Sequence, residues 1–172
     1  MIKNKMNKTC RCLVAVEERA ATVYLSLARR FARNSDLSWF WLEMSMEEKQ
    51  HALLLQFCGC EELFGNNMPD QRAIQTLSDL FTVIEKKTSQ PKLSVDDAFL
   101  IAAELESSEI NAIYARLVGP VKGTPYILRK KVETLGSNHM QSLIRGARRF
   151  RVTPPTMAKL IQLKRQELRR AG

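Results

Sequence analysis

Acidic and histidine side chains interrupt the apolar stripes of the predicted helices. Glu17 stands in the first stripe, four residues after a leucine, and Glu48 and His51 fill the gap between Met44 and Leu55 in the second. Helix positions three or four residues apart share one face. We therefore expect these three polar side chains to point toward the core rather than toward solvent.

The third and fourth stripes contain the same side-chain types. Glu106 and Glu109 lie in the middle of the third stripe, and His139 lies within the fourth. An isolated ionised carboxylate is costly in an apolar interior, and a shared cation removes that cost. Carboxylate and imidazole ligands suit iron, manganese or zinc. The pattern predicts a metal site, and the alternative is a buried polar network without metal.

The elements that must position these residues are helices separated by short breaks. Ser35 or Asp36 is the predicted N-cap after a tight turn, Ser94 opens a capping box, and Thr124 precedes Pro125 at the start of the last long helix. The predicted ranges are 11–33, 36–58, 94–118 and 125–150, with a short helix at 70–87 and a C-terminal helix from Thr153-Pro154-Pro155 to about Arg170.

The lengths of the connections suggest the order in which the helices pack. A tight turn makes the first two helices an antiparallel hairpin, whereas the link over 59–93 is long. Two hairpins joined by one long crossover is the connectivity of a ferritin-like four-helix bundle. We predict an all-α chain, with that bundle in residues 1–150 and an extra basic helix in residues 151–172. Most glycines and prolines fall between the periodic segments, which argues against a sandwich or barrel.

Short segments in four helices resemble those of rubrerythrins and related ferritin-like proteins, and the resemblance covers residues 11–146. In chain order they are Glu17-Glu18-Arg19-Ala20 with Tyr24, Glu48-Lys49-Gln50-His51, Glu106 and Glu109 ahead of Tyr114, and His139. We expect the two tyrosines to be core residues whose hydroxyls reach the carboxylates. Glu18, Glu47 and Glu104 lie off the stripes and are expected to face solvent.

The resemblance implies a di-iron centre that reacts with oxygen or peroxide, as in an oxidase, peroxidase or ferroxidase; manganese and zinc are alternative metals. It implies Glu17 as a terminal ligand, Glu48 as a bridge, His51 as a ligand of the first metal, and Glu106 with Glu109 as its partner or alternate, together with His139, for the second. No residue is assigned a catalytic role beyond metal binding.

The chain departs from this family at Gly136, three residues before His139, where the family pattern has a glutamate. The second bridging carboxylate is therefore missing. Glu133 lies roughly a third of a turn away from the face of His139, and Glu109 is the other candidate replacement. The missing ligand bears on whether one or two metals bind, and an open coordination position would admit a substrate.

Four cysteines form two Cys-x-Cys pairs, Cys10/Cys12 and Cys58/Cys60. Folding the first hairpin about Ser35 places both pairs at the same end of the bundle. Reduced thiols, a disulfide and a four-thiolate metal site remain alternative interpretations, although structural thiolate sites usually use a Cys-x-x-Cys spacing.

The net charge of +9 is concentrated at the C-terminus, where residues 145–172 hold nine basic residues and one acidic residue. This basic helix has three possible roles. It could be a solvated surface helix, it could dock on the bundle, a membrane or a second subunit, or it could contact nucleic acid phosphates. The alternative function is therefore a non-catalytic bundle that binds a partner or nucleic acid through the basic helix.

Two further expectations concern the cell and the assembly. No apolar run approaches the ~20 residues that span a bilayer, and the basic N-terminus is not followed by the apolar region of a signal peptide. We expect a cytoplasmic protein with reduced thiols, and we expect it to form a homodimer.

Overall fold

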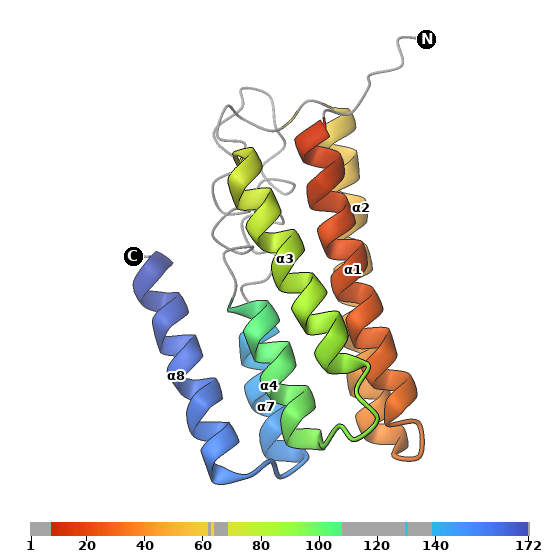
Figure 1. The fold of residues 1–172 in the computed structure, drawn as a ribbon, viewed down its shortest axis with the longest axis vertical. Coiled ribbons are helices and arrows are strands. Elements are labelled where there is room, and N and C mark those ends of the chain that lie inside the picture. The colour runs from red at the N-terminus through yellow and green to blue at the C-terminus, as the bar shows by residue number, and fades with distance from the viewer. Residues whose placement is uncertain (1–7, 62, 64–68, 108–129, 131–138, 172) are drawn as a thin grey trace.

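The computed structural model describes residues 8–61, 63, 69–107, 130 and 139–171, and the structural statements below concern these residues. They form helices and contain no strand, which confirms the prediction of an all-α chain (Figure 1). The helices are α1 (Lys8–Arg30), α2 (Ser35–Cys60), α3 (Gln71–Thr88), α4 (Val95–Glu106), α7 (His139–Arg149) and α8 (Pro154–Ala171).

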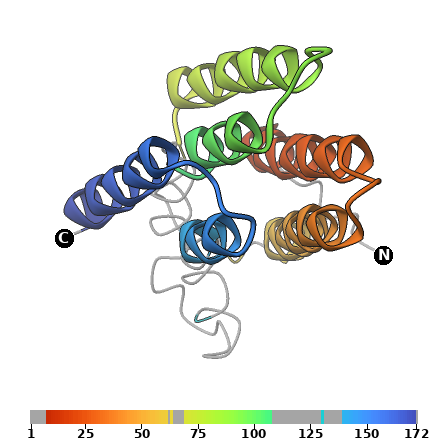
Figure 2. The same cartoon turned by 90° about the horizontal axis from the view of Figure 1, so that it is seen from below.

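Seen end-on, α1, α2, α4 and α7 form a four-sided arrangement in which α1 is beside α2 and α4 is beside α7 (Figure 2). The helix α3 lies outside this arrangement against α1 and α4, and α8 lies outside it against α4 and α7. The apolar side chains between the helices form one core. This core surrounds the polar residues that the sequence places in the apolar stripes.

The α1–α2 hairpin is held by serine hydroxyls as well as by apolar packing. Ser38 Oγ donates to the Ala28 carbonyl at 2.9 Å, and Ser45 Oγ donates to the Ala21 carbonyl at 2.8 Å. Both bonds cross from one helix to the other, so they fix the register of the antiparallel pair. That register determines which residues of α2 face Glu17 of α1.

The helix starts agree in part with the sequence predictions. The capping box is confirmed, since Ser94 Oγ accepts from the Asp97 amide at 3.1 Å and an Asp97 carboxylate oxygen accepts from the Ser94 amide at 3.0 Å. The N-cap predicted for α2 is wrong by one or two residues. Asn34, not Ser35 or Asp36, has the extended backbone of a cap, and its side chain accepts from the Leu37 amide at 3.1 Å.

An aromatic side chain of α2 explains one glycine of α7. A Cβ built on Gly146 would lie 2.6 Å from Phe40 Cζ. The ring of Phe40 packs against Trp41 at a centroid distance of 4.8 Å, and also contacts Phe99 and Phe150. Because these neighbouring rings restrict its movement, the Phe40 ring leaves no room for a side chain at position 146. The contact helps to set the position of α7, which carries His139.

The C-terminal helix docks on the bundle, one of the readings left open by the sequence. The Leu160 side chain of α8 is fully buried, and the preceding turn is anchored where the Thr153 amide donates to Asp96 at 2.8 Å. None of the described helices is both long and apolar enough to cross a bilayer.

Candidate metal centre

Five ionisable side chains from four helices meet inside the bundle. Four of them are buried with at most 4% exposure, and His51 is partly buried. Each lies on the stripe of its helix that also supplies apolar core residues, so packing the stripes together brings the polar groups together. They are Glu17 of α1, Glu48 and His51 of α2, Glu106 of α4 and His139 of α7.

Glu48 is the centre of this group, because its two carboxylate oxygens contact the two histidines. Oε2 lies 2.9 Å from His51 Nδ1, and Oε1 lies 3.0 Å from His139 Nδ1. Glu17 Oε2 lies 3.8 Å from His51 Nδ1, and Glu106 Oε2 lies 3.3 Å from His139 Nδ1. The two imidazole rings stack at a centroid distance of 4.9 Å. The chain therefore places one carboxylate between two imidazoles, with a further carboxylate beside each ring.

The donor atoms fit a metal ion. One ligand atom from each of Glu48, His51 and His139 lies within 4.8 Å of the other two. A tetrahedral ion with ligands at about 2.0–2.2 Å needs such atoms roughly 3–3.6 Å apart, so small side-chain movements bring all three into range. The donors are nitrogen and oxygen, the set that suits iron, manganese and zinc. Glu17 and Glu106 stand beside this trio and could complete its coordination.

Burial and pairing shift the pKa values of Glu17, Glu48 and the two histidines. Burial raises the pKa of Glu17 to about 7 against the opposing effect of His51. Burial alone would lower the pKa of His51, but its contacts with Glu17 and Glu48 outweigh burial and raise the pKa to about 9. Burial and Glu106 oppose ionisation of Glu48, yet its bonds to both histidines leave its pKa below the usual range.

The pKa of His139 is raised in the same way as that of His51. Its burial lowers the pKa of the ring, but Glu106, Glu47 and Glu48 raise it far above the usual range. Without metal, the charges of the carboxylates are therefore balanced by protons on the imidazoles. A metal ion would replace these protons as the positive charge, because a histidine ligand must be deprotonated at the coordinating nitrogen.

Tyr24 supports the site from α1, as expected for a core tyrosine. Its hydroxyl donates to Glu106 Oε1 at 2.5 Å, and its ring stacks on Trp41 at a centroid distance of 6.0 Å. Burial and the nearby carboxylates raise the pKa of Tyr24 well above its usual value, so it stays a neutral donor. The phenol therefore orients the carboxylate of Glu106.

Glu47 is the residue of the site that sequence reasoning missed. It was expected to face solvent, and its side chain is 46% exposed, yet Oε2 lies 3.0 Å from His139 Nε2. The hydrogen bond to His139 lowers the pKa of Glu47. The local periodicity contains no sign of this contact, because it depends on which flank of α2 faces α7. Glu18 and Glu104 behave as expected and form partly exposed ion pairs with Lys49 and Lys87.

Several residues singled out in the sequence analysis lie outside the described part of the chain. They are Glu109, Tyr114, Thr124, Pro125, Glu133 and Gly136.

The cysteines are free thiols, one of the alternatives that the sequence left open, and they lie at one end of the α1–α2 hairpin, as predicted. Cys10 Sγ lies 3.6 Å from the Leu55 carbonyl, one turn before Cys58. Burial raises the pKa values of Cys10 and Cys58 to about 11 each. In the described residues, the trio around Glu48 is the one group of three or more donors that converges on a metal-sized space. The four thiols do not converge in this way, so they form neither a disulfide nor a ready thiolate site.

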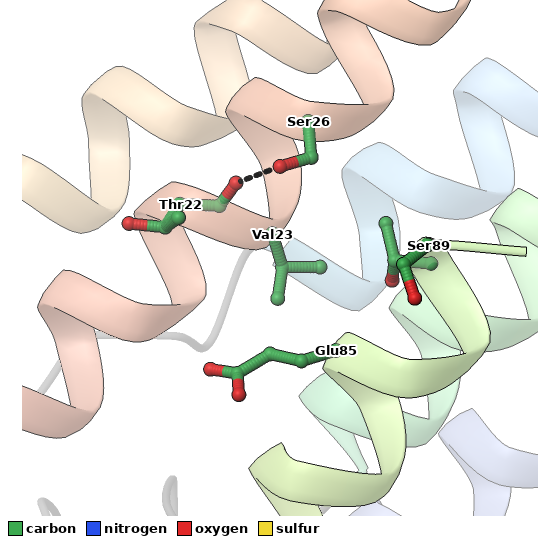
Figure 3. A pocket seen from close by; sticks show the side chains of 6 residues that line it. Thr22, Val23, Ser26, Glu85 and Ser89 are labelled. Atoms are coloured by element: carbon green, nitrogen blue, oxygen red, sulfur yellow. Dashed lines mark hydrogen bonds between the residues drawn. The ribbon is translucent and has the colours of Figure 1, made fainter.

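A shallow pocket between α1 and α3, of about 100 Å³, lies apart from the site (Figure 3). Its hydroxyls are already committed to their own helices, since Thr22 donates to Glu18 and Ser26 donates to Thr22, both at carbonyl oxygens 2.8 Å away. Its carboxylate, Glu85, pairs with Arg19 at 2.8 Å. The pocket therefore has few polar groups left for a ligand.

No family model, curated protein or solved structure matches this chain.

Proposed function

We propose that this chain is a ferritin-like metalloprotein that binds one or two iron-type ions between α1, α2, α4 and α7. One observation carries the proposal: Glu48 lies between His51 and His139, with contacts of 2.9 and 3.0 Å, inside an apolar core. A core made only for stability gains little from such a group, since buried ion pairs are often no more stabilising than apolar residues of similar volume.

The arrangement of the helices supports the ferritin-like part of the proposal. The hairpin of α1 and α2 is followed by a long link that contains α3, and α4 and α7 form the opposite pair (Figures 1 and 2). Metal sites in such bundles are built from inward carboxylates and histidines of facing helices. Glu17, Glu106 and the trio of Glu48, His51 and His139 follow that plan.

The proposed reaction is oxidation of bound iron by oxygen or peroxide, and the bound metal supplies that redox chemistry. The chain's own residues perform the remaining tasks. Glu48 and the two histidines hold the ion, Tyr24 orients Glu106, and the surrounding apolar side chains exclude bulk water. The contacts within the site support metal binding, whereas turnover rests on the resemblance to rubrerythrins.

Elemental analysis tests the binding proposal. Protein purified from iron-supplemented cells is expected to hold about two irons per chain. About one iron is expected if the second site is lost because Gly136 stands where the family pattern has a glutamate. The variant Glu48→Ala/His51→Ala is expected to lose them. The matched control, Glu43→Ala/Gln50→Ala, changes two exposed positions of the same helix and is expected to retain the metal. Wild-type protein without metal would refute the proposal.

Turnover is tested separately on protein loaded with ferrous iron. Consumption of oxygen or peroxide faster than that of free iron is expected, and it should disappear in Glu48→Ala/His51→Ala. A loaded protein that reacts no faster than free iron would remove the enzymatic part and leave a metal-binding protein.

The proposal also covers how copies of the chain assemble and in which compartment the protein is located. The outer face of α2, opposite its buried face, exposes Trp39, Met46, Leu53 and Phe57 to at least 50%. A contiguous exposed apolar patch often marks an interaction surface, so we propose that this face joins two copies of the chain. We place the protein in the cytoplasm, where its four thiols stay reduced.

An alternative function uses the cations of α7, of α8 and of the turn between them. Arg148, Arg151, Lys159 and Arg165 are exposed, and clustered cations bind nucleic acid phosphates in a salt-dependent way. Salt-sensitive retention on DNA or RNA that is lost in Lys159→Glu/Arg165→Glu would favour it. These substitutions are preferable to deleting the tail, because Leu160 is part of the core.

A further inference from the structure

The two nitrogens of the His139 ring face different surroundings. Nδ1 points to the buried group, 3.0 Å from Glu48 Oε1 and 3.3 Å from Glu106 Oε2. Nε2 points the other way and lies 3.0 Å from Glu47 Oε2. The Glu47 side chain is 46% exposed, whereas that of His139 is only 5% exposed. Glu47 therefore stands between the ring and solvent.

This arrangement determines which nitrogen can bind a metal. A histidine ligand coordinates through one nitrogen and keeps a proton on the other. An ionised carboxylate can only accept a hydrogen bond, so the contact with Glu47 requires the proton on Nε2. The lone pair of the neutral ring is then on Nδ1, the nitrogen that faces Glu48.

We propose that Glu47 is a positioning residue, which holds the ring of His139 with Nδ1 directed at the metal and does not itself bind the ion. The inference rests on the proposed function. Carboxylates that accept the second N–H of a histidine ligand orient the ring and increase its basicity. In this chain Glu47 and the central ligand, Glu48, are adjacent in sequence on α2, and their carboxylates contact opposite sides of the His139 ring.

A simple surface ion pair is the competing explanation of the same contact. Half-exposed pairs contribute little to stability, and such a pair would have no effect on metal affinity. The two explanations therefore differ in what Glu47→Ala does to binding, and stability measurements alone do not separate them.

Zinc is the probe for the test, because it is diamagnetic and has no redox chemistry of its own. Zinc affinity is measured by competition with a chromophoric chelator. We expect Glu47→Ala to bind zinc about 10–100-fold more weakly than wild type. Glu47→Gln is expected to lose less, because its amide oxygen still accepts the Nε2 proton. The control Glu43→Ala, exposed one turn earlier on α2, is expected to bind as wild type does.

Nitrogen-15 NMR of the histidine rings supplies a readout that a merely structural role would not change. The chain has two histidines, so the spectrum is simple to assign. In zinc-loaded wild type, His139 is expected as the Nε2–H form with a slowly exchanging proton. In Glu47→Ala this proton should exchange faster, while the fold, followed by circular dichroism, is retained.

The outcomes separate the inference from the proposed function. Wild-type zinc binding with an unchanged affinity and ring signal in Glu47→Ala overturns the role of Glu47 and leaves the metal site intact. An affinity of Glu47→Gln as low as that of Glu47→Ala also contradicts the hydrogen-bond explanation. Wild-type protein that fails to bind zinc or iron overturns both proposals.

Discussion

Replacing Tyr24 by phenylalanine removes one hydroxyl from the centre of the molecule and leaves its packing unchanged. The hydroxyl donates to Glu106 Oε1 at 2.5 Å, and both side chains are buried. The phenylalanine ring can keep the stacking on Trp41. The substitution therefore isolates the contribution of one hydrogen bond to a buried carboxylate.

The contacts of Glu106 set the expected loss of stability. Hydrogen bonds to charged groups contribute about 1.5–3 kcal/mol, and removing the partner of a buried group costs a similar amount. Glu106 keeps its contact of 3.3 Å with His139 Nδ1, so we expect the lower part of this range, about 1.5–2 kcal/mol. For a domain of this size the melting temperature should fall by roughly 3–8 °C.

The assay is urea denaturation of metal-free protein, followed by circular dichroism and by tryptophan fluorescence. Ser26→Ala is the matched control, because its hydroxyl is exposed and donates within its own helix at 2.8 Å; its effect should stay within about 0.5 kcal/mol. A Tyr24→Phe variant as stable as Ser26→Ala would refute the reasoning, since the hydroxyl would then not stabilise the carboxylate.

Three further predictions concern other parts of the fold. Gly146→Ala is expected to destabilise the protein by about 1–2 kcal/mol despite the better helix propensity of alanine, because the new methyl meets Phe40 Cζ at 2.6 Å; thermal melting measures this. Burial holds the pKa values of Cys10 and Cys58 at about 11, so in timed alkylation at pH 8 the two partly exposed cysteines should react first. Leu53→Lys places a charge at a side chain that is 65% exposed on the outer face of α2, and light scattering should show a monomer where wild type is a dimer.

The results that would contradict these three predictions are equally specific. An alanine at 146 that raises the melting temperature would mean that the ring of Phe40 moves aside at little cost. Equal labelling rates for all four thiols would mean that the end of the hairpin opens readily. An unchanged mass in Leu53→Lys, or a monomeric wild type, would remove the outer face of α2 as a dimer interface.

Helix content and the candidate ligands could be predicted from the sequence because both follow from local periodicity. The spacing of apolar residues identifies α1, α2 and α3 within a few residues of their ends. The same spacing placed Glu17 and Glu48 on buried faces, where the structure has them. A charged residue in an apolar stripe is a signal that a single sequence can carry, since burial without a partner is so unfavourable.

The contact of Glu47 could not be predicted in this way. The residue lies on a flank of α2, and whether a flank faces solvent or a neighbouring helix depends on where that neighbour packs. For α7, that position depends partly on the ring of Phe40, a side chain of another helix that packs against Gly146. The cap at Asn34 was missed for a smaller reason, since three successive residues there can all act as N-caps.

The sequence by itself determined that this chain is helical, that a carboxylate lies in the buried stripe of α1 and of α4, and that its two histidines point inward. Local periodicity is sufficient for these conclusions, because each depends on residues within one helix. Tertiary structure alone decided that Glu48 lies between both rings and that Glu47 closes the outer side of His139. Distances between groups on different helices depend on register and on the side chains that separate the helices, and no single helix contains that information.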